Sequence, residues 1–236
     1  MKSHNVNWIL LVVYSIAMAA LEAAVVVYLR ALFYGETVDL FPLQPLSKQL
    51  LWVELIRELA TVVMLVSVGW MLGKNTWSRL GYFLAAFGIW DIFYYVFLFL
   101  FIQWPQSILS WDVLFLIPVP WFGPVLAPCL ISLLLIVLGW IISVQEEKGN
   151  QLAVRKGEAA LMLLGCVFML AAFMQDSLQL IEDGKLDAGE SALMRQMAEF
   201  VPKRFNWGVY TAGLGMLGAG IFIYSRRLKS SHLILY

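Results

Sequence analysis

Six long apolar stretches constrain the fold of this chain more than any other feature of its sequence. Each is long enough to cross the hydrocarbon core of a bilayer, which takes about 20 apolar residues in an α-helix. A spanning helix satisfies its own backbone hydrogen bonds, so these stretches predict an all-α polytopic integral membrane bundle of six transmembrane helices, forming a single domain over residues 1–236. The predicted spans are 7–29, 49–72, 80–102, 124–144, 159–181 and 205–225.

The composition favours lipid as the surrounding solvent. Hydrophobic residues make up 61% of the chain and charged residues 14%, whereas a soluble domain carries about a quarter charged residues. The formal net charge is zero, so we expect membrane lipid and no nucleic acid as a partner. Lys2 and the following apolar run resemble a signal peptide, but the run continues through Val27, which favours a retained first helix.

The apolar segment 105–123 does not fit a simple loop. Joined to the fourth span it would give a run too long for one crossing, and Pro118 and Pro120 interrupt helical hydrogen bonding. We therefore predict an interfacial or re-entrant segment with a short helix near 107–117, followed by a turn and a fourth helix that starts at Pro124. The alternative is one long kinked helix.

The outer loop over 182–204 is predicted to contain a short helix. Asp187 would cap its start and Glu190 would complete a capping box. A calcium-binding loop is the weaker interpretation, because most of the acidic ligands of such a loop are missing.

Lysine and arginine in the connecting segments predict the orientation. The side with both termini carries nine of them, and the opposite side carries six that are interspersed with acids. This bias places both termini in the cytoplasm, and the compact loops favour a bacterial plasma membrane. The nine are Lys2, Lys74, Arg79, Lys148, Arg155, Lys156, Arg226, Arg227 and Lys229; the six are Arg30, Lys48, Lys185, Arg195, Lys203 and Arg204.

Ionisable side chains inside the predicted spans are the strongest functional signal. Each costs at least ~2.5 kcal/mol on insertion scales, so each is expected to face a partner or a cavity. They gather in the half of the bundle away from the termini. Asp91 and Tyr95 lie one turn apart, so the hydroxyl is predicted to orient that carboxylate or to share a proton with it. The candidate proton- or cation-binding residues are Glu22, Glu54, Arg57, Glu58, Asp91, Tyr95, Asp112 and Asp176.

If these acids converge, one arginine cannot balance them, and protons or a bound cation must supply the missing charge. The favoured function is therefore a transporter- or channel-like site, open to the non-cytoplasmic side, for protons, a cation or a small cationic molecule. Carboxylates suit a divalent cation, and any metal would be expected on Glu22, Glu58 and Asp91. The structural alternative has Glu54 and Asp112 reaching the interface while Arg57 links helices by pairing with Glu22 or Glu58.

Two other functions stay open. The chain would be an accessory subunit of a larger membrane complex, or an intramembrane enzyme with a carboxylate-bound divalent metal acting on a lipid or another amphiphile. No catalytic residue is identified. A small-residue stripe formed by Gly208, Ala212, Gly215 and Ala219 is predicted to pack against a helix of this chain or of a partner.

Haem and nucleotide cofactors are not expected. The two histidines, His4 and His232, lie at the chain ends, and Cys129 and Cys166 each stand alone in an apolar run. No glycine-rich nucleotide motif follows a strand.

Overall fold

A computed structural model describes residues 2–33, 41, 47–149, 152–182 and 200–233. Within this part of the chain, six helices are long and apolar enough to cross a membrane. Each apolar stretch of the sequence overlaps one of them. The helices are α1 (Lys2–Phe33), α2 (Lys48–Leu72), α3 (Thr76–Ile102), α4 (Leu126–Glu147), α5 (Lys156–Glu182) and α7 (Trp207–Leu233). The short helix expected at Asp187 lies outside the described residues.

Side-chain caps set the starts of α2 and α3. The Ser47 hydroxyl accepts a hydrogen bond from the backbone N–H of Leu50, which satisfies a donor that the first helical turn leaves free. At α3, Asn75 and Ser78 form a reciprocal capping box. Gly73 to Asn75 connect α2 to α3, so the two helices run antiparallel.

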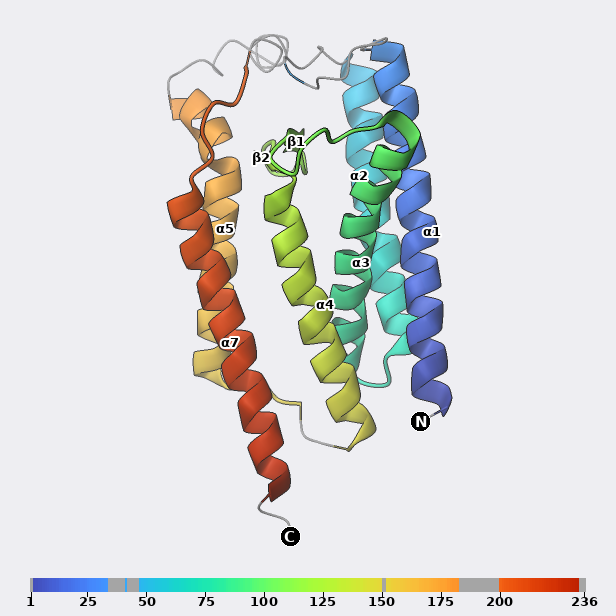
Figure 1. The fold of residues 1–236 in the computed structure, drawn as a ribbon, viewed down its shortest axis with the longest axis vertical. Helices are drawn as coiled ribbons and strands as arrows, with labels where there is room; N and C mark the ends of the chain where they lie inside the picture. The colour runs from blue at the N-terminus through green and yellow to red at the C-terminus, as the bar shows by residue number, and fades with distance from the viewer. Residues whose placement is uncertain (1, 34–40, 42–46, 150–151, 183–199, 234–236) are drawn as a thin grey trace.

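The six helices form two groups with α4 between them (Figure 1). α3 packs against α1, α2 and α4, whereas α5 runs along α7. The start of α1 and the end of α7 lie at the same end of the bundle (Figure 1), as an even number of helices requires. Close approach of α3 and α4 depends on glycine, because a Cβ built on Gly139 would lie 2.3 Å from the carbonyl oxygen of Gly81.

The segment between α3 and α4 forms a β-hairpin, so the prediction of a short helix near 107–117 is wrong. Strand β1 (Trp111–Val113) pairs antiparallel with β2 (Phe122–Pro124), and Asp112 lies opposite Gly123. Pro118 and Pro120 lie in the connection between the strands, where their missing N–H groups disrupt no strand pairing.

Pro124 is accordingly the last residue of β2 rather than the first residue of a helix. α4 begins at Leu126, and the alternative of one kinked helix fails for the same reason. Residues 111–124 are called the hairpin below.

The predicted small-residue stripe does not pack against any described helix of this chain. All four of its residues lie on an exposed face of α7, and a Cβ built on Gly215 would meet nothing within 4 Å. α7 instead approaches α5 through Gly213, where a Cβ would lie 2.7 Å from the carbonyl oxygen of Gly165. A partner for the stripe stays a prediction.

Candidate functional site

A cavity of about 410 Å³ lies among the helices and is lined in part by the hairpin, which lies toward the end of the bundle away from the start of α1 (Figure 1). Its wall is mostly apolar and comes from α1 to α5 and the hairpin. Seven of the eight residues predicted from the sequence line it, namely Glu22, Glu54, Arg57, Glu58, Asp91, Tyr95 and Asp112. The eighth, Asp176 of α5, is half-buried outside this lining.

Helical periodicity explains why these side chains share one cavity. Positions three and four apart lie on one face of a helix, and each contributing helix shows such a face. α1 presents Glu22, Val26, Leu29, Arg30 and Phe33; α2 presents Leu51, Glu54, Arg57, Glu58 and Thr61; α3 presents Phe87, Trp90, Asp91, Tyr94 and Tyr95. α4 and α5 add shorter faces that carry no charge.

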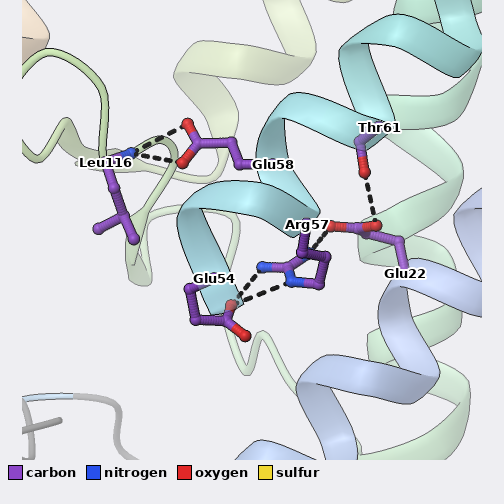
Figure 2. A network of polar contacts seen from close by, with 6 residues as sticks. All are labelled: Glu22, Glu54, Arg57, Glu58, Thr61 and Leu116. Atoms are coloured by element: carbon purple, nitrogen blue, oxygen red, sulfur yellow. Dashed lines mark hydrogen bonds and ion pairs between the residues drawn. The ribbon is translucent and has the colours of Figure 1, made fainter. Parts of the chain in front are cut away.

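Arg57 is the centre of an ion-pair network between α1 and α2 (Figure 2). Its Nε and Nη2 atoms lie 3.0 and 2.7 Å from Oε2 of Glu54, and its Nη1 atom pairs with Glu22. The Thr61 hydroxyl also donates to Glu22, at 3.0 Å. One guanidinium thus serves two carboxylates. Arg57 joins helices in the way the structural alternative expected, through Glu22 and not through Glu58.

Glu58 holds the hairpin against α2. Both of its carboxylate oxygens accept the backbone N–H of Leu116, at 3.0 and 3.1 Å (Figure 2). On the opposite side of the hairpin, the Ser177 hydroxyl of α5 donates to the carbonyl oxygen of Pro120 at 2.5 Å. Among the described residues Glu58 forms no ion pair.

Asp112 is buried, with 3% of its surface exposed. The structural alternative, in which its side chain reaches the membrane interface, is therefore wrong for this residue. The Tyr95 hydroxyl donates to its Oδ2 atom at 3.0 Å, and Nη2 of Arg30 lies 4.0 Å from its Oδ1 atom. Burial raises the pKa of Asp112, while Arg30 and the Tyr95 hydroxyl partly offset that rise. Tyr95 therefore orients Asp112 and not Asp91, contrary to prediction.

Asp91 has a different partner. The Ser132 hydroxyl of α4 donates to its Oδ2 atom at 2.8 Å, and 7% of the residue is exposed. Within the described part of the chain Asp91 forms no ion pair. Its charge, when present, is the least compensated in the cavity.

The sequence prediction missed Arg30, Thr61 and Ser132. Arg30 lies near the end of its apolar stretch, where a flanking position is expected. It follows Glu22 by eight positions, however, and so lies on the same face of α1. Ser132 and Thr61 are small polar residues in apolar runs. Their hydrogen-bond partners lie on other helices, and a single sequence does not show which residues of two helices come into contact.

The cavity holds more acids than bases. Among the described residues, five carboxyl groups and two guanidinium groups line it, an excess of three acidic side chains. No three side chains among the described His, Cys, Asp and Glu residues are arranged to hold a metal ion. Glu22, Glu58 and Asp91 thus share the cavity but do not form the metal-ligand group that the sequence suggested.

Comparisons with protein-family models, with curated protein sequences and with solved structures found no match to this chain.

Proposed function

We propose that this chain is an integral membrane protein whose acidic cavity binds a proton, a cation or a small cationic molecule from the non-cytoplasmic side, as a transporter or channel does. The excess of three carboxyl groups over guanidinium groups among the described residues of one mostly apolar cavity supports this proposal most strongly. Carboxylates in such surroundings must be protonated or balanced by a positive charge.

The outward surface of the bundle supports insertion into a membrane. Large apolar side chains are exposed along the helices, including Leu32, Met71 and Leu163 at 78%, 80% and 66%. A soluble monomer rarely exposes so many large apolar side chains. We propose a bacterial plasma membrane with both termini in the cytoplasm, which directs the cavity end of the bundle outward.

A purely structural role explains part of the site. Arg57 pairs with both Glu22 and Glu54, and its pairing with Glu22 stabilises the contact between two helices. It leaves Glu58 and Asp91 without an ion pair among the described residues. Variants of these two carboxyl groups therefore distinguish the binding interpretation of the cavity from the purely structural one.

Charge titration in a lipid environment tests the proposal. We expect the full chain in nanodiscs to take up protons on acidification, or to gain thermal stability when a cation is added, and we expect Asp91→Asn and Glu58→Gln to reduce that response. Asp176→Asn is the matched control, because Asp176 lies outside the cavity lining. Equal responses from the wild type and both cavity variants, with the fold intact, would refute the proposal.

The exposed stripe on α7 favours a second candidate function, an accessory subunit of a membrane complex. Small residues on an outward helix face permit close approach by a partner helix. Recovery of a stoichiometric partner after mild detergent extraction, lost when Gly215 is changed to Leu, would support it. The third candidate, a metal-dependent enzyme, has the weakest support, because the described residues offer no group of three ligands.

A further inference from the structure

Six aromatic side chains form a continuous wall of the cavity. Phe87, Trp90 and Tyr94 come from α3, Phe115 and Trp121 from the hairpin, and Phe173 from α5. Successive ring centroids from Tyr94 through Trp90, Phe87, Phe115 and Trp121 to Phe173 are 6.2, 5.5, 6.2, 5.2 and 6.4 Å apart. Aromatic faces bury apolar groups and also attract organic cations.

Asp91 lies beside this aromatic wall. It follows Trp90 directly and precedes Tyr94 by three positions on the same helix face. It receives one hydrogen bond, from Ser132, and forms no ion pair among the described residues. The Asp91 carboxylate and the aromatic rings therefore line the same cavity, whose described side chains include an excess of acids.

A buried donor points to a second feature of the ligand. The indole N–H of Trp90 finds no acceptor in the described part of the chain, although only 6% of the residue is exposed. The indole N–H of Trp121, on the same wall, is also buried and also lacks an acceptor among the described residues. A buried donor without an acceptor costs free energy. Protein atoms cover both nitrogens in this structure, but both rings line the cavity, so a small rotation of either side chain would bring its N–H to an oxygen atom on a bound molecule.

These features distinguish among the positive species that the cavity could bind. A hard metal cation requires about six or more oxygen ligands, and no group of three suitable side chains was found among the described residues. A proton alone requires neither an aromatic wall nor a cavity of about 410 Å³. A volume of this size falls in the range of roughly 300–1,000 Å³ that is usual for organic ligands.

We propose that the cavity binds a lipophilic amine in its protonated form, with an oxygen acceptor close to the nitrogen. Asp91 pairs with the ammonium group, the aromatic wall packs against the apolar body, and the Trp90 N–H donates to the oxygen. This inference rests on the proposed function and narrows its ligand to one chemical class.

Three matched probes test the proposal on the full chain in lipid nanodiscs, with binding to empty nanodiscs subtracted. N-dodecylethanolamine carries the charge, the oxygen and the apolar chain. N-lauroylethanolamine keeps the chain and the hydroxyl but is neutral, and ethanolamine keeps the charge without the chain. We expect saturable binding of N-dodecylethanolamine and binding at least about tenfold weaker for the other two.

Variants assign the binding to the cavity. Asp91→Asn keeps an acceptor for Ser132, and we expect it to weaken binding of N-dodecylethanolamine roughly 30-fold or more, as for a buried charge pair that loses one partner. Trp90→Phe keeps the ring and loses the donor, for an expected loss of roughly threefold to tenfold. Asp176→Asn should bind like the wild type.

The outcomes separate this inference from the proposed function. The lipophilic-amine proposal is overturned if the neutral probe binds as tightly as N-dodecylethanolamine, or if Asp91→Asn and Trp90→Phe both leave the affinity unchanged. The proposed acidic site still stands in that case if protons or metal cations act through Asp91. If no positive species acts through the cavity, both proposals fail. Should Asp91→Asn not fold, as judged by gel filtration, the neutral probe and Trp90→Phe decide.

Discussion

Arg57 and Asp91 illustrate two ways in which a protein accommodates charge in apolar surroundings. Arg57 is compensated within the fold, because Glu22 and Glu54 both pair with its guanidinium. Asp91 receives a single hydroxyl hydrogen bond. Removing one member of a compensated pair mainly costs stability, whereas changing the less compensated group should mainly alter what the cavity binds.

Tyr95 allows a direct measurement of one contact in the site. Tyr95→Phe removes the hydrogen bond to the buried Asp112, so we expect the free energy of unfolding to fall by about 1–3 kcal/mol. Denaturant titration in detergent micelles measures the change. Tyr94→Phe is the control, because the Tyr94 hydroxyl donates no hydrogen bond to a described residue. Equal losses in the two variants would contradict the assignment of Tyr95 to Asp112.

At the scale of elements, helical periodicity made the charged part of the site predictable. The apolar stretches located the six helices, and helical spacing places Glu54 and Glu58 on one face with Arg57 on an adjoining edge. The individual partners were not predictable, because they depend on how elements distant in sequence pack. Tyr95 illustrates this, since its partner Asp112 comes from the hairpin rather than from its own helix.

The hairpin itself lacked a distinguishing local pattern. Its strands are three residues each, too short to show the alternation that marks a strand. The prolines of its connection, Pro118 and Pro120, terminate a helix as readily as they fit a turn. Its position depends on tertiary contacts with Glu58 and Ser177.

The contact between α3 and α4 can be tested at a glycine. In Gly139→Ala the new methyl group would overlap the backbone of Gly81, so we expect a loss of about 1–3 kcal/mol from overpacking. Gly215→Ala on α7 meets open space and should be neutral or gain up to ~1 kcal/mol from helix propensity. Thermal unfolding of the two variants makes the comparison. A stable Gly139→Ala would refute the close approach of these helices.

At the scale of the whole molecule, the imbalance of acids over bases should create a negative potential in the cavity. Cys166 of α5 lines the cavity and is half-buried, so its thiol reports on that potential. In a Cys129→Ser background we expect a cationic methanethiosulfonate reagent to modify Cys166 roughly tenfold faster than an anionic one. Mass spectrometry measures both rates.

Salt provides the control for this experiment. Added salt should reduce the ratio of the two rates, because it screens charges at the mouth of the cavity, and Asp91→Asn should reduce it further. A ratio at or below one in low salt would show that the cavity carries no net negative potential.

The origin of the cavity wall along the chain has a consequence for biosynthesis. In the described part of the lining, every charged group lies between Glu22 and Asp112, whereas α5 contributes Cys166, Met169, Leu170 and Phe173. The carboxylates of the cavity are therefore synthesised before α5, the helix that supplies the last part of the cavity wall. A nascent chain that ended after α4 would leave the acidic cavity without the wall that α5 supplies.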